Sequence, residues 1–100
     1  MSFEGQIALV TGASRGIGRA IALALAAQGA KVIGTATSES GAAAISEALA
    51  AYGGQGRVLN VRDAAASEAL VETIGKELGA ISILVNNAGV TRDNLLLRMK

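Results

Sequence analysis

Two hydrophobic periods alternate along this chain, and each change of period predicts a change of secondary structure. Short, almost wholly apolar runs are typical of strands buried on both faces, whereas longer runs with apolar residues three or four positions apart are typical of helices. The expected strands are 6–11, 31–35, 57–61 and 81–86, and the expected helices are 16–28, 41–52, 65–78 and 91–100.

The same spacing predicts the face that each helix buries. In the first helix these residues are Ile17, Ile21, Ala24 and Leu25. In the second they are Ile45, Ala48, Leu49 and Tyr52, and in the third Leu70, Ile74 and Leu78 with Val71 beside them. Strands that alternate with helices of this length predict a parallel sheet with right-handed crossovers, and therefore one α/β domain over 1–100.

A glycine-rich stretch, Gly12-Ala13-Ser14-Arg15-Gly16-Ile17-Gly18, joins the first strand to the first helix. Glycines permit a tight backbone path, and the start of a helix offers free N–H donors and the positive end of its dipole. Both features are typical of a phosphate-binding turn. The alternative is a plain strand-to-helix turn, but the position at the first junction of a strand–helix series favours a dinucleotide.

No acidic residue follows the second strand before Glu39. Sites for NAD place an Asp or Glu about 20 residues beyond the glycines, where it accepts the ribose hydroxyls. The absence of this acid, together with Arg15 and the hydroxyls of Thr37 and Ser38, favours the 2′-phosphate of NADP. Taken singly, Arg15 has the alternative of a solvated surface charge, and the two hydroxyls have the alternative of helix caps.

Three asparagines, Asn60, Asn86 and Asn87, end the third and fourth strands. Ligands of parallel sheets bind at the carboxyl ends of the strands, so the three amides are candidates for contact with adenine or ribose. Alternatively, they pin neighbouring strands by bonding to backbone groups, which is at least as strong a hypothesis for Asn86. Asp63 is predicted to cap the third helix.

The amino-acid composition mainly excludes certain classes of function. The sequence has no His and no Cys, which removes the commonest metal ligand and excludes disulfides. A net charge of +1 with one Tyr and no Trp gives no basis for nucleic-acid binding. The longest apolar run, 20–27, falls short of the roughly 20 residues of a membrane span. Residues 1–5 lack the basic start of a signal peptide, so we expect a cytoplasmic location.

Two motifs, Thr11-Gly12-x-x-x-Gly16-x-Gly18 and Asn86-Asn87-Ala88-Gly89, together resemble the short-chain dehydrogenase/reductase family. The resemblance extends over the whole chain and implies a Rossmann-type, doubly wound parallel sheet with strand order 3-2-1-4 and an incomplete second half. Residues 34–39 and 91–100 are similar to a bacterial branch of the family. That branch uses NADPH to reduce 3-oxoacyl groups carried on acyl carrier protein in fatty-acid synthesis.

The resemblance also implies which residues bind NADP. The loop up to Arg15 would bind the phosphates, Thr37 the 2′-phosphate region, and Asn87 the nicotinamide-side ribose. Asn60 and Val61 would line the adenine pocket. The full set of implied cofactor-binding residues is Gly12, Ala13, Ser14, Arg15, Ile17, Gly18, Thr37, Asn60, Val61, Asn87, Ala88 and Gly89.

The chain departs from the family pattern because it lacks the catalytic Ser and the Tyr-x-x-x-Lys. Its one tyrosine, Tyr52, is followed four positions later by Gly56. The resemblance therefore implies the cofactor-binding portion of a reductase, catalytically silent by itself. The alternatives are another short-chain reductase or a non-enzymatic half-domain that binds NADP or self-associates. An open edge at the fourth strand, and the tetramers of the parent family, lead us to expect a homo-oligomer.

Overall fold

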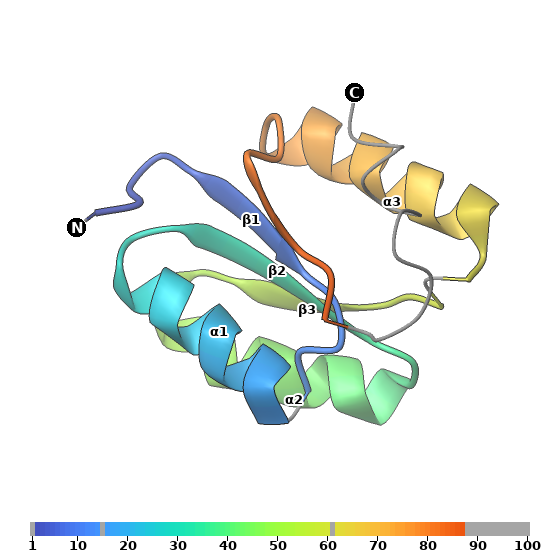
Figure 1. Ribbon diagram of the computed structural model, residues 1–100, viewed down its shortest axis with the longest axis horizontal. Helices are drawn as coiled ribbons and strands as arrows, with labels where there is room; N and C mark the ends of the chain where they lie inside the picture. Colours follow the sequence, from blue (N-terminus) through green and yellow to red (C-terminus); the bar gives the residue numbers. More distant parts are fainter. Residues whose placement is uncertain (1, 15, 61, 88–100) are drawn as a thin grey trace.

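The computed structural model describes residues 2–14, 16–60 and 62–87, and the structural statements below concern these residues. Strands and helices alternate as predicted (Figure 1). The elements are β1 (Ile7–Val10), α1 (Gly16–Ala27), β2 (Lys31–Ala36), α2 (Glu39–Leu49), the 3-10 turn η1 (Ala50–Tyr52), β3 (Gln55–Val58), α3 (Ala64–Glu77) and β4 (Ile83–Val85). The helix predicted for 91–100 lies outside the described residues.

The strands form one parallel sheet in the order β3-β2-β1-β4. Both the parallel α/β architecture and the order 3-2-1-4 are therefore confirmed. From β1 the chain winds outward to β3, and it then returns to the other side of β1 to form β4. The direction of winding thus changes between β1 and β4, and open sheets bind their ligands at the carboxyl ends of the strands beside such a change.

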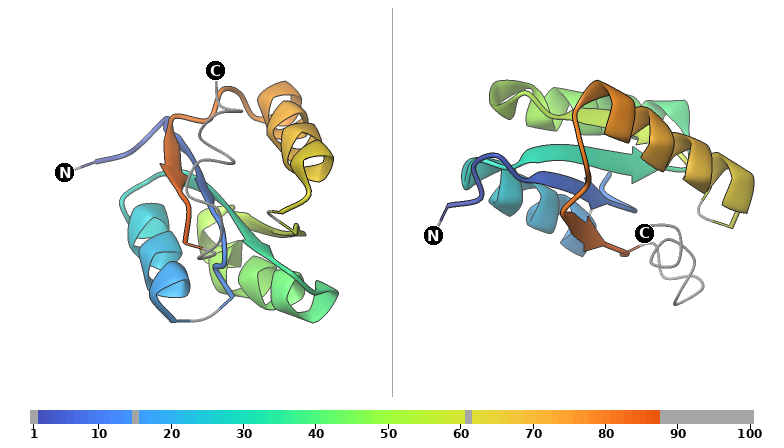
Figure 2. Two further views of the ribbon diagram at one scale, coloured as in Figure 1. Left: turned by 45° about the vertical axis from the view of Figure 1, so that its right-hand side comes forward. Right: turned by 90° about the horizontal axis from the view of Figure 1, so that it is seen from above.

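Helices cover both faces of the sheet: α1 and α2 lie on one face and α3 lies on the other (Figure 2). Val10, Val32 and Ile45 belong to the core beneath α1 and α2, whereas Leu9 and Ile33 belong to the core beneath α3. Successive residues of a strand point to opposite faces, so adjacent residues of β1 and of β2 divide between the two cores.

Small side chains, rather than the large apolar ones predicted, face the sheet from α1. Its buried residues are Gly18, Ala22 and Ala26, whereas Ile17 is 73% exposed and Ala24 is also exposed. The predicted face is therefore wrong at Ile17 and Ala24. The physical reason is close approach, because a helix that buries Gly and Ala can bring its backbone nearer to the strands than one that buries Ile.

Glycines in the strands bring α2 close to the sheet as well. A Cβ added at Gly34 would lie 2.8 Å from Ile45 Cγ2, and one added at Gly56 would collide with the carbonyl oxygen of Ala42. The backbone N–H of Gly56 also donates to the Ser46 hydroxyl oxygen at 2.8 Å. Backbone contact and a side-chain hydrogen bond therefore fix α2 against β2 and β3.

The predicted faces of the second and third helices are largely confirmed, since Ile45, Leu49, Leu70 and Ile74 are buried. Ala48, Val71 and Leu78 are half-buried. The exception is Tyr52, which is 46% exposed. It lies in η1, after α2 has ended, so the periodicity of α2 does not place it on the buried face.

Two element boundaries differ most from the prediction. α2 begins at Glu39 rather than Gly41, because the Ser38 side chain caps it by accepting a hydrogen bond from the Gly41 N–H at 3.1 Å. β3 spans 55–58 rather than 57–61. Its pairing with β2 already begins at Gln55, opposite Ile33.

Candidate functional site

Hydrogen bonds join the residues that follow β1 to those that follow β4. The fully buried Thr11 donates its backbone N–H to the carbonyl oxygen of Val85 at 3.0 Å. Its hydroxyl accepts a hydrogen bond from the Asn87 N–H at 2.9 Å and donates to Asn86 Oδ1 at 3.2 Å. Asn86 therefore makes a structural contact, because its hydrogen bond with Thr11 joins the ends of two neighbouring strands.

The glycine loop is held on both sides. Gly12 and Gly16 have φ values of 63° and 65°, in the left-handed region that glycine adopts without strain. The Gly12 carbonyl oxygen accepts a hydrogen bond from Asn87 Nδ2 at 3.2 Å. On the opposite side, the Ala13 N–H donates to the Thr35 carbonyl oxygen at 2.9 Å. Hydrogen bonds thus attach the loop to the end of β4 on one side and to the end of β2 on the other.

The same loop is closed toward the sheet and open above the start of α1. A Cβ added at Gly18 would lie 2.5 Å from Asn87 Nδ2 and would collide with the Gly12 carbonyl oxygen, whereas one added at Gly16 would meet no atom within 4 Å. The first turn of α1 contains no acidic residue. Because free N–H groups and the helix dipole favour an anion there, this end of α1 fits the phosphates of a dinucleotide.

Hydroxyl groups gather where β2 passes into α2. Thr37, Ser38 and Ser40 are all exposed, and the two serine hydroxyl oxygens lie 3.2 Å apart within hydrogen-bonding distance. Ser38 is the cap of α2, so its hydroxyl is already engaged with the backbone. The Thr37 side chain has no hydrogen-bond partner within the described part of the chain, which leaves it available to a ligand. Glu39, in the first turn, adds a negative charge nearby.

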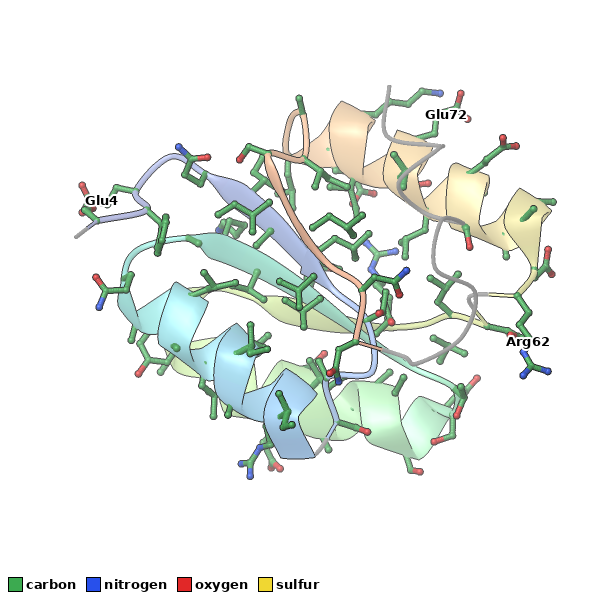
Figure 3. All side chains as sticks on the ribbon, in the orientation of Figure 1. Glu4, Arg62 and Glu72 are labelled. Atoms are coloured by element: carbon green, nitrogen blue, oxygen red, sulfur yellow. The ribbon has the colours of Figure 1, made fainter. Side chains whose placement is uncertain are left out.

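The polar side chains that follow β3 make hydrogen bonds within local turns. Asn60 Oδ1 accepts a hydrogen bond from the Arg62 N–H at 3.0 Å. Asp63 accepts one from the Ala66 N–H at 3.0 Å and caps α3, as predicted. In Figure 3, Arg62 extends outward from this end of the sheet, while Glu4 lies at the opposite end.

Of the predicted site residues, the structure places a subset at the carboxyl edge of the sheet: Gly12, Ala13, Ser14, Ile17, Gly18, Thr37, Asn60 and Asn87. Within this subset Asn87 bonds directly to the glycine loop. Thr37 follows β2, the neighbour of β1, and Asn60 follows β3, one strand further from the loop. Arg15, Val61, Ala88 and Gly89 lie outside the described residues, and their roles stay predictions.

A surface depression of about 250 Å³ lies at the other, amino end of the sheet, lined by Gly5, Gln6, Ile7, Gly29, Lys31 and Leu78. The Gln6 side chain on its wall already accepts a hydrogen bond from Ser82. Within 2–14, 16–60 and 62–87, no cluster of acidic side chains suits a metal ion. None of the helices described is long and apolar enough to cross a membrane.

Comparison with known protein families gives a match along almost the whole chain. The model of short chain dehydrogenases matches residues 6–100, which include β1, the loop and the Asn86-Asn87 pair. The chain belongs to the short chain dehydrogenase family. Membership accounts for the strand order and for the position of the loop at the first strand–helix junction.

Relatives within the short chain dehydrogenase family carry the name 3-oxoacyl-acyl-carrier-protein reductase FabG. The Escherichia coli K12 protein is 69% identical over 100 residues, and that of Vibrio cholerae is 63% identical over 100 residues. The Pseudomonas aeruginosa protein is 60% identical over 102 residues. Each alignment covers 100% of this chain and 41% of the relative, so the chain spans less than half the length of these relatives.

Proposed function

We propose that this chain is the cofactor-binding portion of an NADPH-dependent reductase. Its reaction would convert 3-oxoacyl to 3-hydroxyacyl groups carried on acyl carrier protein. The observation that carries the proposal is the 69% identity to the Escherichia coli FabG reductase along the whole chain. On this proposal, residues 1–100 form one NADP-binding domain of the Rossmann type.

The geometry of the carboxyl edge fits a nicotinamide dinucleotide, which supplies a hydride when it is bound. The open start of α1 would receive the pyrophosphate, with the N–H groups around Gly16 and Ile17 as donors. The exposed Thr37 hydroxyl and the start of α2 would receive the 2′-phosphate. Support for NADP over NAD comes from the absence of a carboxylate between β2 and Glu39, since such a group would repel the 2′-phosphate.

Protonation of the reduced substrate would fall to residues outside this sequence. Tyr52, its one tyrosine, lies in η1 just before β3 begins, at the amino end of the sheet and away from the glycine loop. No lysine stands four residues beyond it, because that position is Gly56. The chain therefore binds and orients the cofactor without providing the general acid.

Fluorescence titration of this chain with NADPH, and separately with NADH, tests the proposal. We expect saturable binding that favours NADPH, and we expect Arg15→Ala to remove the preference by deleting a cation that would face the 2′-phosphate. Arg19→Ala is the matched control, because Arg19 is exposed in α1 and outside the glycine loop. Failure to bind either nucleotide, or equal affinity for both, would contradict the proposal.

A further inference from the structure

Gly41, in the first turn of α2, is the point where three segments of the carboxyl edge come together. A Cβ added at Gly41 would lie 2.7 Å from Ala36 Cβ, 3.3 Å from Ser38 Oγ and 3.5 Å from Ser14 Cβ. These atoms belong in turn to the end of β2, the cap of α2 and the glycine loop. A side chain at this position would therefore overlap Ala36, crowd Ser38 and come into ordinary contact with Ser14.

The backbone itself does not require glycine at this position. Gly41 is not among the described glycines with positive φ, and it lies inside a helix, where glycine is less favourable than alanine. Gly75 in α3 provides a contrast, because a Cβ added there would meet nothing within 4 Å. What distinguishes Gly41 is thus the space that its missing side chain leaves between neighbouring segments.

The contact with Ala36 cannot relax through a side-chain rotation, because a methyl group has no alternative rotamer that moves Cβ. Ala36 is only 6% exposed and lies opposite Val58 in the sheet. Its carbonyl oxygen also accepts a hydrogen bond from the Leu59 N–H at 2.8 Å. Because β2 is fixed in this way, a side chain at Gly41 must displace the start of α2.

Displacing the start of α2 moves Ser38, and Thr37 beside it, relative to Ser14 in the glycine loop. We propose that Gly41 is a positioning residue that sets the separation between the pyrophosphate and 2′-phosphate regions, and thereby the preference for NADPH over NADH. The inference rests on the proposed function. NADH lacks the 2′-phosphate, so a change in this separation affects NADPH more than NADH.

Gly41→Ala tests the inference when both nucleotides are titrated against the same protein. We expect the ratio of the NADH to the NADPH dissociation constant to fall about tenfold, which corresponds to about 1.4 kcal/mol. Gly75→Ala is the matched control, since it also replaces a helical glycine but meets no neighbour. Its ratio should equal that of the unmodified chain, and a purely structural effect of Gly41→Ala would weaken both nucleotides equally.

The double variant Ala36→Gly/Gly41→Ala provides a rescue, because it removes the methyl group that opposes the new one. We expect it to restore the NADPH preference, including in the case where Gly41→Ala alone fails to fold in a thermal unfolding assay. The inference would be overturned if folded Gly41→Ala had an unchanged ratio of NADH to NADPH dissociation constants, or if a folded double variant lacked the preference for NADPH. Either result would leave the proposed function standing. An unmodified chain that binds neither nucleotide would instead overturn the proposed function, and the inference with it.

Discussion

The hydroxyl of Thr11 accepts a hydrogen bond from the backbone N–H of Asn87 at 2.9 Å, across 76 positions of sequence. Each residue lies just beyond the end of its strand, β1 for Thr11 and β4 for Asn87. The bond, together with that from Asn87 Nδ2 to the Gly12 carbonyl oxygen, makes the glycine loop depend on β4 for its position.

Thr11→Val should lower the free energy of unfolding by about 1–3 kcal/mol, because the fully buried site would leave the Asn87 N–H without its partner. Urea denaturation followed by circular dichroism measures this loss. Thr11→Ser is the control, since it keeps the hydroxyl and should lose less. Equal stability of the two variants would show that the hydrogen bond contributes nothing.

Gly18→Ala should abolish nucleotide binding, because its Cβ would collide with the Gly12 carbonyl oxygen and force the loop away from Asn87. Titration with NADPH provides the measurement. Gly75→Ala serves as the comparison and should raise the free energy of unfolding by about 1 kcal/mol without affecting binding. Normal NADPH affinity in Gly18→Ala would show that the loop geometry is not needed for the cofactor.

Substitution of Ser38 should separate stability from cofactor preference. Ser38→Ala removes the cap of α2 and should cost about 0.5–2 kcal/mol of stability, measured by thermal unfolding. Ser38→Asp retains a capping oxygen and should keep the stability, but its carboxylate would repel a 2′-phosphate, so affinity for NADPH should fall relative to NADH. If Ser38→Asp retained the preference, the 2′-phosphate would have to bind elsewhere.

Ser67 lies in α3 with its hydroxyl oxygen buried and without a hydrogen-bond partner among the residues that the structure describes. Such a group has lost its hydration without compensation, so Ser67→Ala should raise the free energy of unfolding by about 1 kcal/mol. Ser67→Cys, which keeps the size but weakens the polarity, should be intermediate when both are compared in urea. A clear loss of stability in Ser67→Ala would count against this account.

The order of the elements could be predicted from the sequence because apolar runs mark β1 and β4 and helical periodicity marks the segments between strands. The buried face of α1 could not be predicted in this way. Periodicity weighs large residues such as Ile17 most heavily, whereas the structure buries Gly18, Ala22 and Ala26. Alanine and glycine are compatible with either side of a helix, and their burial depends on how closely α1 approaches β1 and β2. That distance is a property of tertiary packing.

At the candidate site, the sequence places the loop at a strand end but does not separate the roles of neighbouring residues. Thr37 and Ser38 both carry a hydroxyl, and geometry alone shows that Ser38 caps α2. The contact between Thr11 and Asn87 likewise depends on β1 and β4 being neighbours in the sheet. The cofactor role of Arg15 and the self-association of the chain stay predictions.

β3 forms one edge of the sheet, and its Gly56 N–H is bonded to Ser46 in α2. A strand from another molecule extends a sheet by bonding to backbone groups that the edge leaves unpaired. Here a helix of the same fold already occupies one of those groups, and Arg57 in the same strand is paired with Glu77 at 3.1 Å. A strand added at β3 would therefore have to displace the Ser46 hydroxyl from the Gly56 N–H and disturb the Arg57–Glu77 ion pair.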